Sequence, residues 1–71
     1  MKKFVICTDN SGVEASLEIR KIYEVLTDKR AEKTGMLRII DNSGEDYLHS
    51  SKRFIPITLD MKIYKAIFKN D

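Results

Sequence analysis

Apolar residues in this chain come in short runs, and polar, turn-forming residues separate the runs. Residues 3–8 (KFVICT) and 21–26 (KIYEVL) are rich in β-branched and aromatic side chains, which favour strands. The first run ends at Asp9, and Thr27 with Asp28 ends the second. We therefore predict a short β-strand over each run.

Further along the chain, two apolar runs lie close enough together to predict a β-hairpin. Residues 36–40 and 45–49 flank a short connection that contains Gly44, which tolerates the backbone angles of a tight turn. Residues 54–57 (FIPI) predict another short strand. Because Pro56 has no N–H for a ladder hydrogen bond, we expect this strand at a sheet edge or broken there.

Two segments fit more than one structure. Apolar and polar residues alternate over residues 13–19, which favours a strand or an extended loop, and a helix over residues 13–26 is the rival. The charged segment of residues 28–34 fits one helical turn, capped by Asp28 and stopped by Gly35, or a plain loop.

The end of the chain has the spacing of an amphipathic helix. We predict this helix over about residues 60–69, with Asp60 as its N-cap. Its apolar stripe is Ile63, Tyr64, Ile67 and Phe68. We expect the strands to form a small barrel. For so small a core we expect the stripe to pack on its own domain, at the mouth of that barrel, with a second chain as the alternative.

Composition and length agree with one small folded domain. The 71 residues carry 42% hydrophobic residues, which is enough for a core and argues against disorder. Five short strands and one terminal helix predict an all-β fold, either a small barrel or a sandwich. The net charge of +2 is too small to indicate nucleic-acid binding on its own.

Cysteine and histidine usage restricts the chemistry. Cys7 is the only cysteine, so an internal disulfide and a cysteine-rich zinc site are both excluded. His49 is the only histidine, and we expect no metal and no cofactor. We interpret Cys7 as a small buried apolar residue of the first strand and His49 as a lone surface histidine.

Several features predict a cytoplasmic protein. A single unpaired cysteine fits a reducing compartment. The apolar runs are far shorter than the ~20 residues of a membrane span, so we expect no membrane partner. The basic start, residues 1–3, precedes an apolar run that stops at Asp9, too short for a signal peptide.

The tetrapeptide DNSG occurs twice, at residues 9–12 and 41–44. A phosphate loop needs more glycines, and a calcium loop needs acidic residues at alternate positions over about twelve residues. Both copies follow an apolar or β-branched strand end. We therefore predict two turns, a longer excursion after the first copy and a tight hairpin at the second.

The order of these pieces resembles an SH3-like β-barrel. The long first connection (residues 9–20), the strand at 21–26 and the tight hairpin around 41–46 are similar to the layout of that barrel. The resemblance implies one domain over residues 1–71, with the barrel at about 3–58. The chain has no Trp, and it lacks the acidic first loop with neighbouring tyrosines of the SH3 domains that bind proline-rich peptides.

A second resemblance concerns longer stretches of sequence. Residues 21–26, 37–48 (LRIIDNSGEDYL) and 54–57 are similar to a group of short uncharacterised bacterial proteins. The similarity extends over roughly residues 4–59. It implies a bacterial source and an SH3-like fold, and it implies no particular activity.

Aromatic and basic residues gather near the end of the predicted hairpin. The candidate partner-binding residues are Tyr47, His49, Lys52, Arg53 and Phe54. Rings interleaved with basic side chains can bind nucleic acid by stacking and phosphate contact. The alternative is that Tyr47 or Leu48 faces the core and that Lys52 and Arg53 form a solvated corner.

No catalytic set of residues stands out, so we predict that the protein is not an enzyme. We expect a non-catalytic protein-interaction or accessory module that binds through its loops and the Tyr47 to Phe54 corner. The alternative is a nucleic-acid-binding SH3-like module that uses the same corner. The sequence favours a monomer and leaves a dimer open.

Overall fold

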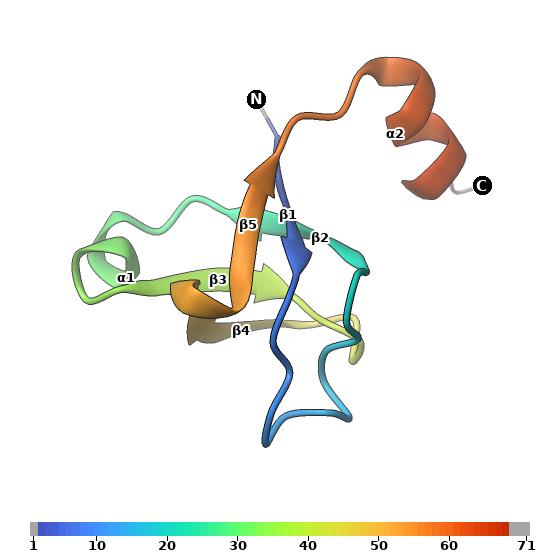
Figure 1. Ribbon diagram of the computed structural model, residues 1–71. Coiled ribbons are helices and arrows are strands. Elements are labelled where there is room, and N and C mark those ends of the chain that lie inside the picture. The colour runs from blue at the N-terminus through green and yellow to red at the C-terminus, as the bar shows by residue number, and fades with distance from the viewer. Residues whose placement is uncertain (1, 69–71) are drawn as a thin grey trace.

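The computed structural model describes residues 2–68, which form one five-stranded antiparallel sheet and two short helices (Figure 1). The strands are β1 (Lys3–Cys7), β2 (Ile22–Leu26), β3 (Met36–Ile40), β4 (Asp46–Ser50) and β5 (Phe54–Ile57). The helices are α1 (Lys29–Lys33) and α2 (Met61–Phe68), and a 3₁₀ turn, η1 (Ser51–Arg53), joins β4 to β5.

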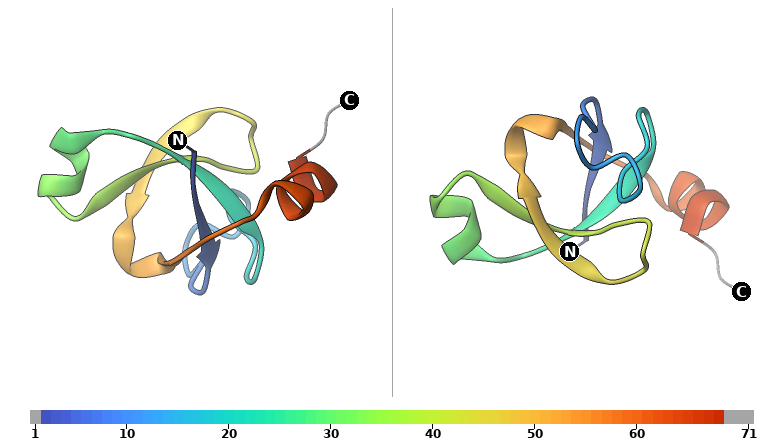
Figure 2. Two further views of the ribbon diagram at one scale, coloured as in Figure 1. Left: turned by 90° about the horizontal axis from the view of Figure 1, so that it is seen from above. Right: turned by 90° about the horizontal axis from the view of Figure 1, so that it is seen from below.

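The strand order is β4-β3-β2-β1-β5, so β4 and β5 are the two edges of the sheet. The sheet curls strongly (Figure 2), but within residues 2–68 its two edge strands do not pair with each other. The predicted all-β fold of five strands with a C-terminal helix is confirmed as an open, curled sheet, and the closed barrel stays a prediction.

The core lies on the concave face of this sheet, called the inner face below. Paired residues of antiparallel strands share a face, so Val5 of β1 lies beside Tyr23 of β2 and Pro56 of β5. Cys7 is 0% exposed, which confirms its predicted burial. The main cluster is Val5, Cys7, Leu17, Tyr23, Val25, Ile39 and Phe54.

The excursion between β1 and β2 is a loop made of successive turns, so of the alternatives for residues 13–19 the strand is wrong, the loop is present but coiled instead of extended, and the rival helix over 13–26 is wrong. The N–H groups of Ser16 and Leu17 both bond the carbonyl of Val13, which coils the backbone too tightly for a strand. Leu17 enters the core, whereas Ile19 is exposed. The alternation therefore does not separate a buried face from a solvated one.

The charged segment after β2 forms the capped helical turn that the sequence offered as one of two structures. Oδ1 of Asp28 accepts the N–H of Ala31 at 3.0 Å, as an N-cap does. Gly35 ends the turn with a φ of +78°, a conformation that glycine adopts without steric cost. Oδ2 of Asp28 also accepts a hydrogen bond from Nε of Arg38 at 2.9 Å, which ties α1 to β3.

Both DNSG copies form the same local structure. In each, Oδ1 of the Asp accepts the N–H of the Ser two residues on, at 2.9 Å, and the Gly has a positive φ. These residues are Asp9, Ser11 and Gly12 in the first copy, and Asp41, Ser43 and Gly44 in the second. The first opens the long excursion and the second forms the tight β3–β4 hairpin, which confirms both predictions.

The last strand and the last helix also follow the sequence prediction. β5 with Pro56 is an edge strand, and Oδ1 of Asp60 accepts the N–H of Ile63 at 2.8 Å, so Asp60 caps α2. The helix is described as far as Phe68, and the predicted last position, Lys69, lies outside the described residues.

Helix α2 packs on the outer, convex face of the sheet instead of on the mouth of a barrel. Phe4 points to this face, because its neighbours in β1, Lys3 and Val5, belong to the inner one. The Phe4 ring lies 5.6 Å from the ring of Tyr64 and 5.1 Å from that of Phe68. The expected docking on its own domain therefore holds for these two rings, while Ile63 and Ile67 remain exposed.

Candidate functional site

The residues of the candidate partner-binding corner are divided between the core and the surface. His49 and Phe54 are buried in the core, with their ring centroids 6.3 Å apart in an edge-on arrangement. Tyr47 is 51% exposed, and Lys52 is exposed as well. Arg53 is half-buried, and its Nη1 donates to the carbonyl of Asp9 at 3.3 Å. The five residues therefore do not form one surface.

His49 is not the surface histidine that the sequence suggested, because its side chain is only 8% exposed. It is paired with Leu37 of β3, so it shares the inner face of the sheet with that residue. Its Nε2 lies 3.0 Å from Oδ2 of Asp41, which is buried too. Its partner, Asp41, is eight residues earlier in the sequence, on the other side of the hairpin. The residues next to His49 in the sequence therefore do not indicate this contact.

The carboxyl group of Asp41 joins the hairpin loop to the core. Burial alone would raise the pKa of Asp41, but hydrogen bonds from Ser43 and His49 outweigh it and hold that pKa below its ordinary value. The hydroxyl of Ser43 donates to Oδ1 of Asp41 at 2.6 Å. Serine and histidine both bond the same carboxylate, so this arrangement differs from a catalytic triad, in which the serine bonds the histidine.

A second polar cluster holds the long excursion against the hairpin. The hydroxyl of Tyr23 accepts the N–H of Glu18 at 2.7 Å and donates to Oδ1 of Asn42 at 2.9 Å. The N–H of Asn42 bonds the carbonyl of Ser16 at 2.9 Å. The asparagine of the second DNSG copy therefore fixes the excursion that the first copy begins.

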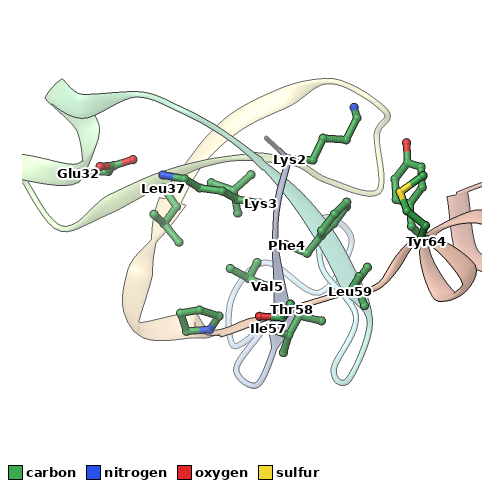
Figure 3. A pocket seen from close by; sticks show the side chains of 13 residues that line it. Lys2, Lys3, Phe4, Val5, Glu32, Leu37, Ile57, Thr58, Leu59 and Tyr64 are labelled. Carbon is green, nitrogen blue, oxygen red and sulfur yellow. The ribbon is translucent and has the colours of Figure 1, made fainter.

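A pocket of about 720 Å³ lies at the end of the sheet where β1 begins and β5 ends. We call it the apolar pocket. Its apolar walls include Val5, Val25, Leu37, Pro56, Leu59 and Met61. Figure 3 shows Glu32 and Leu37 on one side and Leu59 and Tyr64 on the other. The volume falls within the range of about 300–1,000 Å³ that is typical of ligand sites.

Charged groups border the apolar pocket. Nζ of Lys2 donates to Glu24 at 3.0 Å, whereas Lys3 pairs with none of the carboxylates in residues 2–68. Glu32 of α1 is also part of the lining and has no ion-pair partner in that part of the chain. The lining therefore combines an apolar surface with one lysine and one glutamate that form no ion pair within residues 2–68.

Sequence reasoning did not find this pocket. Its lining comes from four strands, both helices and the segment between β5 and α2, so no single motif marks it. The charged start, Lys2 and Lys3, was the only local signal, and we interpreted it in terms of targeting. The reactive side chains Cys7, Asp41 and His49 lie outside the lining.

Within residues 2–68, no group of three His, Cys, Asp or Glu side chains is placed to hold a metal ion. No helix in the same range combines the length and the apolar character needed to cross a membrane. Comparison with protein-family models, with curated proteins and with solved structures finds no significant match to this chain. Function is therefore inferred from the geometry of the side chains.

Proposed function

We propose that this protein is a non-catalytic protein-interaction module that binds a peptide segment of a partner in the apolar pocket. The observation that carries the proposal is the pocket itself, about 720 Å³ with apolar walls and with charges that come from lysine and glutamate side chains. Apolar walls with a few polar groups favour recognition of a bulky apolar side chain.

The charges indicate the chemistry of the partner. Lys3 is available for an ion pair, so the segment that fits best carries an acidic residue beside its apolar anchor. The anchor would fill the space between Leu37 and Leu59, and the acidic residue would approach Lys3. Figure 3 shows the Lys3 side chain extending to the Leu37 side of the pocket, where Glu32 also lies, so the acidic residue would approach Lys3 from the side away from Glu32.

Defined peptides test this proposal. Acetylated peptides with Leu or Phe beside Glu should bind, and matched peptides with Lys in place of that Glu should bind about tenfold more weakly. Equal binding of both series, or binding of neither, would contradict the proposed partner chemistry. Fluorescence anisotropy of labelled peptides measures the difference.

A pair of variants locates the binding. Met61→Glu adds a negative charge to the pocket wall and should weaken binding of the acidic peptides by about tenfold. It should not harm the fold, because Met61 is the exposed first residue of α2, where an acidic side chain suits the helix dipole. The control, Ile67→Glu, changes an exposed residue of α2 outside the pocket and should leave binding unchanged.

We also propose that the open sheet belongs to the SH3-like class and that the protein is bacterial and cytoplasmic. The strand order, the long excursion before β2 and the tight β3–β4 hairpin support the SH3-like assignment. The bacterial source depends on the sequence resemblance alone, and the cytoplasmic location on the single free cysteine.

A further inference from the structure

The two edges of the sheet differ in how they meet solvent. β5 carries Pro56, which has no N–H and therefore makes a poor template for another strand. β4 is the opposite edge and contains neither proline nor lysine, the usual protections of an exposed strand. One edge is thus blocked and the other is open.

The hydrogen-bond pattern identifies which backbone groups of β4 point away from the sheet. At one end of the hairpin, the N–H of Asp41 bonds the carbonyl of Glu45, and at the other the N–H of Ser51 bonds the carbonyl of Gly35. Antiparallel ladders alternate bonded and non-bonded pairs. Every second residue over 45–51 therefore directs its backbone groups to β3.

The residues between them direct their N–H and C=O groups outward. These residues are Asp46, Leu48 and Ser50. Leu48 is the middle one, and its side chain is 43% exposed on the outer face, opposite Arg38. The open edge is thus a short row of backbone donors and acceptors centred on an exposed leucine.

We propose that two copies of this chain pair through β4, antiparallel and in one register, with Leu48 facing Leu48 across a two-fold axis. In this register, the outward backbone groups of Leu48 bond each other reciprocally, and Asp46 lies opposite Ser50 of the second copy. Tyr47 then lies opposite His49 of the second copy. The two open sheets become one continuous sheet.

The alternative registers are disfavoured by charge or by strand length, and axes at Tyr47 or His49 leave part of Asp46–Ser50 without a strand residue opposite it. A two-fold axis at Asp46 places two carboxylates directly opposite each other, which destabilises an antiparallel pair. An axis at Ser50 extends the pairing into η1, where the backbone is no longer a strand. The axis at Leu48 uses the whole strand and opposes no like charges.

Pairing in this register also covers the exposed apolar side chains of β4. Leu48 packs on Leu48 of the second copy on the outer face, and the half-exposed ring of Tyr47 gains a neighbour on the inner face. Self-association thus uses a different surface from the apolar pocket, because no residue of β4 lines that pocket.

Sedimentation equilibrium over a concentration series tests the proposal. The wild-type chain should move from a mass of 8.2 kDa towards twice that value as concentration rises. Leu48→Lys should raise the dissociation constant at least about tenfold, because it removes the apolar contact and opposes two cations. A wild-type chain that stays monomeric up to millimolar concentration would overturn the proposal.

A matched control and a charge-exchange experiment test the edge and the register. Ile55→Lys makes the same change at a similarly exposed residue of β5 and should leave association unchanged. Leu48→Asp and Leu48→Lys should each stay monomeric alone and associate when mixed, since only the proposed register opposes position 48 with itself. A mixture that remains monomeric contradicts the register.

The peptide assay separates this proposal from the proposed function. Leu48→Lys should bind the acidic peptides as the wild type does, because the pocket is formed by other residues. If Leu48→Lys fails to fold, its circular-dichroism spectrum will differ from that of the wild type. Leu48→Thr is then used instead of Leu48→Lys, because threonine keeps the strand propensity and removes most of the apolar contact. Dimerisation that Leu48→Thr leaves unchanged counts against the Leu48 contact.

Discussion

Nε2 of His49 lies 3.0 Å from Oδ2 of Asp41, and both side chains are buried. The pair joins β4 to the first residue of the second DNSG loop. The first DNSG copy has the same turn, but its Asp9 is exposed, and its nearest cation is Nη1 of Arg53 at 3.7 Å. One tetrapeptide therefore occupies two different environments.

Removing the carboxylate should cost far more in the second copy than in the first. Asp41→Ala leaves the buried His49 without its partner and should lower the free energy of unfolding by about 2–3 kcal/mol. Asp9→Ala removes the same turn hydrogen bond at the surface and should lower the free energy of unfolding much less. Urea denaturation of both variants measures the difference, and equal losses would show that the turn alone matters.

Stability should fall in acid, and Asp41 should contribute to the loss. Its pKa in the folded protein lies below the ordinary value of 3.8, because the hydrogen bonds from Ser43 and His49 outweigh the effect of burial. A lowered folded pKa stabilises the protein above the unfolded pKa, and this stability is lost as the pH falls through the folded pKa. The pKa of Asp28 is also lowered, first by the N–H of Ala31 and then by Arg38.

The acid effect can be separated by variant. The free energy of unfolding should decrease in wild type as the pH is lowered from about 5 to about 2, and the decrease should be smaller in Asp41→Asn. Identical pH profiles for the two proteins would exclude Asp41 as a contributor. Urea denaturation at several pH values provides the measurement.

The docking of α2 should depend on Phe4. Phe4→Ala removes the ring on which Tyr64 and Phe68 pack and should lower the free energy of unfolding by about 3 kcal/mol. Amide hydrogen exchange in α2 should become faster at the same time. Ile67→Ala, at an exposed position of the same helix, should change stability by less than about 0.5 kcal/mol.

We expect little or no binding to oligonucleotides. Burial of His49 and Phe54 leaves Tyr47 as the exposed ring of the corner, and stacking platforms depend on accessible rings. Filter binding with single-stranded DNA and RNA at low salt measures this directly. Tight binding that weakens steeply with added salt would support the nucleic-acid alternative instead.

Local structure in this chain followed from local sequence. The Asp28 cap, Gly35, the two DNSG turns and the edge proline each act through backbone groups within a few residues, so their effects could be predicted. The excursion over residues 13–19 could not. Its alternating apolar residues predicted a strand, but the backbone forms turns. Asn10 and Asn42, which lie outside the segment, hold these turns by hydrogen bonds to the carbonyl groups of Leu17 and Ser16.

The candidate site was less predictable because it depends on contacts between distant residues. His49 is buried by its register with Leu37 and by Asp41 across the hairpin, neither of which is its sequence neighbour. The apolar pocket combines side chains from both ends of the described chain, such as Lys3 and Leu59. The pattern of residues along the sequence does not show which distant side chains come together in the fold.

The central claim is that the apolar pocket binds an apolar side chain beside an acidic one. NMR titration of the isotope-labelled protein with the tightest acidic peptide tests it most directly. We predict chemical-shift changes at Val5, Leu37 and Leu59, and unchanged signals for Tyr47 and Lys52. Changes confined to Tyr47 and Lys52, or none at saturating peptide, would contradict the claim.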